Sequence, residues 1–106
     1  MNKFGLTNEN FNLLQKVFSN NPEINNVLLF GSRAKGNYNN RSDIDLVITN
    51  DLPNRYVIGK ILDEVNNSNF PYLIDLQVLS NITNQNLLEH IKRVGLVFYN
   101  KERTQQ

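Results

Sequence analysis

Short apolar runs alternate along this chain with segments of helical periodicity, and this alternation is the feature that most limits its possible folds. Residues 25–30, 43–49 and 72–79 have the length and apolar content of β-strands. Apolar residues elsewhere recur at the spacing of one helix face. The expected helices lie at residues 8–19, at 32–36 as a short turn, from Pro53 to about 66, and near 84–94. This order predicts an α/β fold, with helices packed over a small sheet.

The segment 43–49 alternates in character, as a half-buried strand does. Ile44, Leu46 and Ile48 are expected to face the core, while Asp43 and Asp45 point together to the opposite side. The C-terminal run at 96–99 is expected either as an edge strand or packed under the sheet.

Size and composition limit the classes of protein. A chain of 106 residues fits one domain, 1–106, and its net charge of +1 gives no reason to expect nucleic-acid binding. There is no cysteine, so disulfides and thiolate metal sites are excluded. No apolar run approaches the roughly 20 residues that cross a bilayer. We therefore expect a cytoplasmic protein that does not bind membranes.

Carboxylates interrupt two of the expected strands. Asp43 and Asp45 lie two residues apart, and Asp75 lies inside the apolar run 72–79. Like charges side by side in a half-buried strand are unfavourable unless a cation lies between them. Hard cations such as Mg²⁺ or Mn²⁺ prefer carboxylate oxygens, and two such ions suit the transfer of a nucleotidyl group from ATP. Asp75 is also a candidate to take the acceptor proton.

A turn before the carboxylates is suited to phosphates. Gly31 would let the backbone approach a triphosphate, and Ser32 would offer a hydroxyl at the start of a short helix. Ser42 is a candidate second hydroxyl, and Arg33 and Lys35 are either phosphate partners or solvated cations.

Several of these residues have ordinary explanations when taken singly. A Gly-Ser pair after a strand is a common turn, and one Asp is common at a strand start. His90, the only histidine, is interpreted as a surface or boundary residue, and it leaves no basis for a zinc cluster or a Ser-His-Asp triad.

The combined pattern resembles the DNA polymerase β-like nucleotidyltransferase superfamily. Gly31-Ser32, a ten-residue spacer, Asp43-Ile44-Asp45 and then Asp75 match its motif, and GSRAKG followed by RSDIDL is similar to the minimal nucleotidyltransferases (MNT). The resemblance implies a mixed sheet, two Mg²⁺ ions and ATP as substrate. By position, Asp43, Asp45 and Asp75 would be the catalytic metal ligands, and Gly31 and Ser32 would bind the triphosphate.

The resemblance also implies a partner. MNT proteins are often encoded beside a helical HEPN-domain toxin, and some act as antitoxins by transferring AMP to a tyrosine of that toxin. We expect this function, with the two chains forming a hetero-oligomer, because the short chain leaves little room for an acceptor-binding segment. The alternatives are transfer to a small molecule, such as an aminoglycoside, and an antitoxin that neutralises its partner by contact alone.

Overall fold

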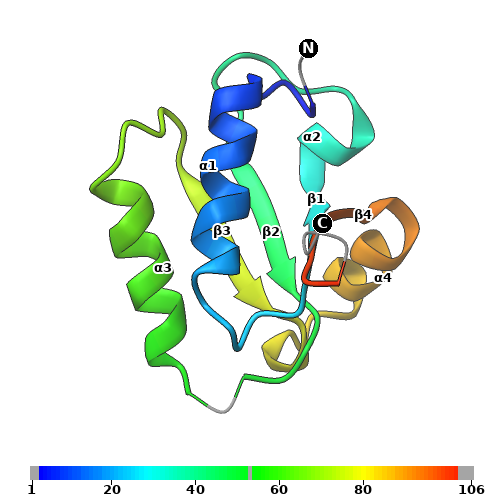
Figure 1. Ribbon diagram of the computed structural model, residues 1–106. Coiled ribbons are helices and arrows are strands. Elements are labelled where there is room, and N and C mark those ends of the chain that lie inside the picture. Colours follow the sequence, from blue (N-terminus) through cyan, green and yellow to red (C-terminus); the bar gives the residue numbers. More distant parts are fainter. Residues whose placement is uncertain (1–2, 53, 103–106) are drawn as a thin grey trace.

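A mixed four-stranded sheet forms the centre of the protein (Figure 1). The computed structural model describes residues 3–52 and 54–102. The strands are β1 (Asn26–Phe30), β2 (Ile44–Ile48), β3 (Ile74–Val78) and β4 (Leu96–Asn100), in the spatial order β3-β2-β1-β4. β1 pairs antiparallel with β2 and β4, whereas β2 and β3 are parallel. The α/β prediction and the mixed sheet are confirmed.

The helices are α1 (Asn8–Ser19), α2 (Gly31–Lys35), α3 (Tyr56–Asn66) and α4 (Gln85–Val94), with a 3-10 turn η1 (Leu79–Asn81) after β3. α1 begins at Thr7, whose hydroxyl accepts the Asn10 N–H at 3.1 Å. α4 begins likewise at Asn84, whose side chain accepts the Leu87 N–H at 3.1 Å. Both caps pair amide groups that have no partner inside a helix.

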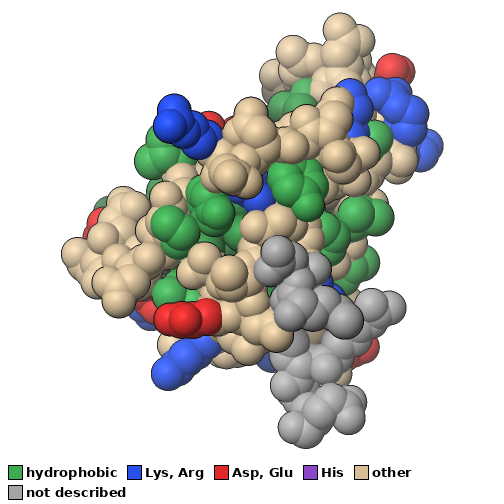
Figure 2. All heavy atoms as spheres, turned by 90° about the horizontal axis from the view of Figure 1, so that it is seen from above, with side chains coloured by type: hydrophobic (Ala, Val, Ile, Leu, Met, Phe, Trp, Pro, Cys, Tyr) green, Lys and Arg blue, Asp and Glu red, His purple; other side chains and the backbone are tan. Residues whose placement is uncertain are grey.

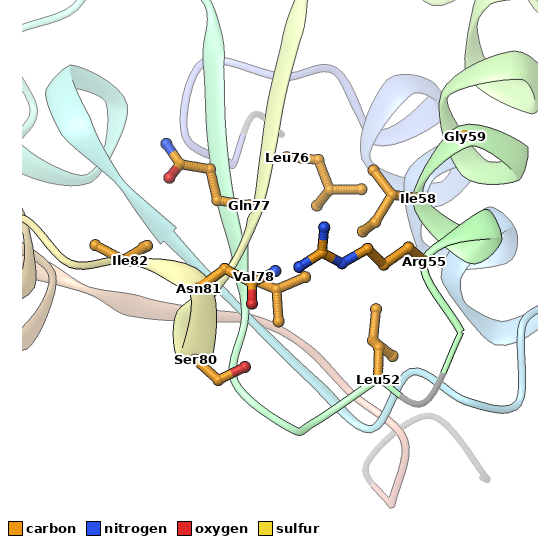
Figure 3. A pocket seen from close by; sticks show the side chains of 10 residues that line it. All are labelled: Leu52, Arg55, Ile58, Gly59, Leu76, Gln77, Val78, Ser80, Asn81 and Ile82. Carbon is orange, nitrogen blue, oxygen red and sulfur yellow. The ribbon is translucent and has the colours of Figure 1, made fainter.

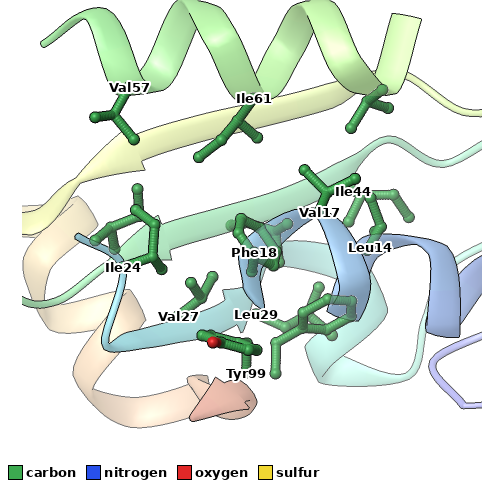
Figure 4. Close-up of a cluster of buried hydrophobic side chains, with 14 of the residues drawn as sticks. Leu14, Val17, Phe18, Ile24, Val27, Leu29, Ile44, Val57, Ile61 and Tyr99 are labelled. Atoms are coloured by element: carbon green, nitrogen blue, oxygen red, sulfur yellow. The ribbon is translucent and has the colours of Figure 1, made fainter. Parts of the chain in front are cut away.

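The main core lies between α1, α3 and one face of the sheet (Figure 4). Ile44, Leu46 and Ile48 are all fully buried there, as expected. They pack with side chains from both helices, among them Leu14, Phe18, Val57 and Ile61. Burial of each such side chain stabilises the fold by about 1.5–3 kcal/mol.

The opposite face is covered too, which the alternation in 43–49 did not predict. Val47 is fully buried, and it forms a second core cluster with Phe30 of β1 and Ile91 of α4. Leu87 and Val94 of α4 pack against this cluster. α4 therefore lies over one side of the face that carries the carboxylates.

Several boundaries differ by one or two residues from expectation. β2 begins at Ile44, so Asp43 precedes the strand instead of opening it. β3 begins at Ile74, two residues later than expected. The C-terminal run is an edge strand, the first of the two alternatives. Pro53, expected at the start of the third helix, lies outside the described residues, and α3 begins at Tyr56.

No helix among residues 3–52 and 54–102 is long and apolar enough to cross a membrane.

Candidate active site

Two of the three predicted carboxylates lie side by side on neighbouring strands. Asp45 of β2 is in register with Asp75 of β3 in the parallel pair. Both therefore point to the same face, which is also the face of Val47 and α4. Asp43 lies two residues before Asp45, just outside the strand. Asp45 is half-buried, while Asp43 and Asp75 are exposed.

The surroundings of Asp45 disfavour its negative charge. The pKa of Asp45 is raised above 3.8, first because burial disfavours the charged carboxylate, and then because Asp75 and Asp43 repel it. Its negative charge thus costs free energy that a nearby cation would offset. Asp75 is held in place from the side, since its Oδ2 accepts the Gln77 Nε2–H at 3.2 Å.

The donor set fits a hard divalent cation in its chemistry. Three carboxylates offer only oxygen atoms as ligands, and Asp45 is the one whose pKa the other two raise. In their present rotamers, however, no three His, Cys, Asp or Glu side chains of the described residues are grouped closely enough to hold a metal ion. Metal ligation by Asp43, Asp45 and Asp75 therefore stays a prediction.

Gly31 lies at the joint between β1 and α2, directly against Asp45. Its φ is +74°, a value that L side chains rarely adopt. A Cβ built at Gly31 would lie 2.2 Å from Asp45 Oδ2. We expected glycine here to make room for a triphosphate. The structure gives a nearer reason, because the space beside Gly31 Cα is filled by the Asp45 carboxylate.

The two predicted hydroxyls have different surroundings. Ser32 is the second residue of α2, and its side-chain hydroxyl has no hydrogen-bond partner among the described residues, so it is available to a ligand. The Ser42 hydroxyl accepts the Asn39 N–H at 3.0 Å and so helps to shape the loop before β2. Phosphate binding by either residue, as by Gly31, stays a prediction.

Arg33 requires a correction. It is only 2% exposed, and its guanidinium donates to the carbonyl oxygens of Ser42 at 2.8 and 3.1 Å and of Phe4 at 2.8 Å. Its Cζ also lies 4.5 Å from the Tyr72 ring centroid and 5.2 Å from that of Tyr38. Arg33 is thus not a solvated cation, and backbone carbonyls engage its guanidinium. Phosphate binding by Arg33 stays a prediction. Lys35, by contrast, is exposed.

His90 is a residue of this region whose place the sequence did not reveal. Its Nε2 accepts the Gly31 N–H at 3.1 Å, and its ring packs edge-on against Phe30, with centroids 6.2 Å apart. One indication of its surroundings was visible in the sequence, because His90 lies three residues after Leu87, at the margin of the apolar stripe of α4. That position indicates a boundary residue, but it does not indicate which residue His90 contacts.

A cavity lies beside this group and does not contain it. A space of about 590 Å³ opens between the start of α3 and the end of β3 (Figure 3). Arg55 reaches across it toward Val78, between Leu76 and Leu52. Gln77 also lines this cavity while it donates to Asp75, so the cavity and the carboxylates are neighbours along the exposed edge of β3.

Charged side chains are spread over the surface. Figure 2 shows hydrophobic side chains gathered near the middle of one face, with Lys and Arg mostly in separate groups around its rim.

Comparison with known proteins places this geometry in a family. The family model for polymerase beta nucleotidyltransferases matches residues 12–104. A search of curated proteins by sequence gives no match.

Solved structures share the fold at low sequence identity. A toxin-antitoxin structure with AMP-PNP is 22% identical, with a TM-score of 0.67 over 89% of this chain and 76% of the other. A structure of the toxin-antitoxin MntA-HepT is 18% identical, with a TM-score of 0.61 over 92% and 75% of the two chains. A protein from Sulfolobus solfataricus described as a nucleotidyltransferase is 21% identical, with a TM-score of 0.54 over 88% and 78%. With the family model covering most of its length, this chain belongs to the polymerase beta nucleotidyltransferase family.

Proposed function

We propose that this protein transfers AMP from ATP, with Mg²⁺ or Mn²⁺, to a hydroxyl group of a helical HEPN-type toxin, and so acts as its antitoxin. A tyrosine is the proposed acceptor. The proposal joins the family's nucleotidyl-transfer chemistry to a protein acceptor.

The observation that carries the transfer chemistry is the pairing of Asp45 with Asp75 beside Gly31. Two carboxylates in register on rigid strands give a fixed base for a cation site. The raised pKa of Asp45 supports cation binding there, because a divalent ion would replace repulsion with attraction. Asp43, just before the strand, is the proposed third ligand.

In the proposed reaction the acceptor oxygen attacks the α-phosphorus of ATP. A bond forms between that oxygen and the phosphorus, and the bond from the α-phosphorus to the α–β bridging oxygen breaks. Pyrophosphate leaves with the bonding electron pair, and the acceptor proton passes to Asp75 and then to water. When bound, the divalent ions would stabilise the charge that develops on the entering and leaving oxygens. The Ser32 hydroxyl is the proposed donor to the triphosphate.

The partner is supported by likeness of fold. Two of the similar structures are toxin-antitoxin assemblies, one holding AMP-PNP and one described as MntA-HepT. The edge of β3 also leaves Asp75 accessible to a second protein, since Asp75 is exposed and β3 is the last strand of the sheet.

Intact mass spectrometry of the partner tests the proposal. The HEPN-type protein encoded beside this chain is incubated with it, ATP and Mg²⁺, and its mass is expected to increase by one or more AMP units. The Asp75→Asn variant should give no increase. Asp51→Asn changes an exposed carboxylate outside the site and should behave as the wild type.

Other outcomes would favour the alternatives. An unmodified partner that is still inhibited in a stable complex would favour neutralisation by contact. An unmodified, uninhibited partner, together with AMP transfer to an aminoglycoside, would favour a small-molecule acceptor. Either result would refute AMP transfer to the toxin.

A further inference from the structure

His90 joins α4 to the glycine at which β1 passes into α2. The Gly31 N–H donates to its Nε2 at 3.1 Å, across 59 positions of sequence. Gly31 is the first residue of α2, where an amide has no carbonyl partner within the helix. The His90 ring also packs edge-on against Phe30, at an interplanar angle of 80°. Two consecutive residues, the last of β1 and the first of α2, are therefore held by one side chain.

This hydrogen bond defines the state of the imidazole. A nitrogen that accepts an N–H carries no proton, so the neutral ring must have its proton on Nδ1. The bond also fixes the plane of the peptide between Phe30 and Gly31, because the N–H lies in that plane. Glycine, with no side chain of its own to restrain it, depends on such a contact to hold a defined direction.

The orientation of the Gly31 peptide in turn affects the position of Asp45, a predicted metal ligand. Gly31 Cα is so close to Asp45 that a Cβ there would lie 3.0 Å from the carboxylate carbon. A rotation of the Gly31 peptide would therefore move the backbone atoms that lie against the Asp45 carboxylate. The same rotation would change the direction of α2 and of the free Ser32 hydroxyl.

We propose that His90 is a positioning residue of the nucleotidyl-transfer site, acting through the Gly31 N–H to hold Asp45 and Ser32 in place. It does not touch the reacting atoms in this role. The inference rests on the proposed function where it is tested by nucleotide binding. Its other test, on the protein alone, needs no nucleotide.

The first test is nuclear magnetic resonance of the protein alone. Long-range ¹H–¹⁵N spectra at mildly alkaline pH should show His90 as the Nδ1–H tautomer. The Gly31 amide should be protected from hydrogen exchange, and His90→Phe should speed its exchange about tenfold, because the ring remains but the acceptor is lost. A spectrum of the Nε2–H tautomer would overturn the inference.

The second test is calorimetric binding of AMP-PNP with Mg²⁺. Loss of one hydrogen bond predicts roughly 3- to 10-fold weaker binding by His90→Phe. His90→Gln offers an amide oxygen near the position of Nε2 and should restore most of the affinity. Glu89→Gln, an exposed neighbour on α4, is the matched control and should bind as the wild type.

The outcomes separate the two proposals. Equal binding by wild type and His90→Phe, or failure of His90→Gln to recover while both variants stay folded, would refute the positioning role. A wild type that binds no AMP-PNP would refute the proposed function, and the tautomer and the Gly31 exchange rate would still decide whether His90 holds the turn. If His90→Phe does not fold, the tautomer and the His90→Gln variant decide it.

Discussion

Replacing Gly31 with alanine should damage the site more than the fold. Gly31 is the first residue of the short helix α2 and Gly36 follows its last residue, and their φ angles are similar, at +74° and +88°. An L residue in this region costs about 1–2 kcal/mol. Gly31→Ala and Gly36→Ala should therefore each lower the free energy of unfolding by about that amount, as measured by urea denaturation.

The two variants differ in what the new methyl group meets. At Gly36 nothing lies within 4 Å of a built Cβ, whereas at Gly31 it would lie 2.2 Å from Asp45 Oδ2. The closest atom is the end of a side chain, so the carboxylate can rotate away. Asp45 Cβ would also lie 3.3 Å from the new methyl group, so the backbone there must give by only a few tenths of an ångström. The stabilities of the two variants should then agree within about 1 kcal/mol, while Asp45 in Gly31→Ala is displaced from its place beside Asp75.

The displacement should appear in nucleotide binding. Disturbing groups that orient a metal ligand typically weakens metal binding roughly 10- to 100-fold. We expect a loss of that size for AMP-PNP with Mg²⁺ in Gly31→Ala, measured by calorimetry, and less than a twofold change in Gly36→Ala. Equal affinities in the two variants would refute the argument that Gly31 is required by Asp45. A much larger loss of stability in Gly31→Ala would show that Asp45 is not free to rotate.

The elements predicted from sequence are those with strong local patterns. Ile44, Leu46 and Ile48 identified β2 because a two-residue period is visible without any tertiary information. The burial of Val47 was missed, since it depends on where α4 packs. The C-terminal run was left with two alternatives for a similar reason. Its pairing with β1, for example of Tyr99 with Val27, joins segments far apart in sequence.

The site was predictable in its residue types and less so in its contacts. The apolar runs predicted that Asp45 and Asp75 lie on strands, but their register, which places the two side by side, is visible only in the structure. The solvated alternative for Arg33 was wrong, because a basic residue beside a phosphate motif cannot reveal that Phe4 and Tyr72 fold against it. His90 was passed over because its partner lies on another element.

Two further variants test the electrostatics of Asp45 and the role of Arg33. Asp45→Asn should abolish AMP transfer yet raise the melting temperature in metal-free buffer. Because the folded-state pKa of Asp45 is raised above 3.8, its ionisation destabilises the fold at neutral pH, and this cost disappears as pH falls toward 3.8. The stability difference between Asp45→Asn and wild type should therefore shrink on acidification, and a difference that grows would contradict the raised pKa. Arg33→Lys should lower the free energy of unfolding by about 2–3 kcal/mol, since an ammonium cannot reproduce the planar fork that binds the Ser42 and Phe4 carbonyls. Arg41→Lys, at an exposed position, should change it by less than about 0.5 kcal/mol. If Arg33→Lys instead kept its stability in urea denaturation and lost affinity for AMP-PNP, then Arg33 would be a phosphate ligand after all, because only a bound nucleotide would then depend on its guanidinium.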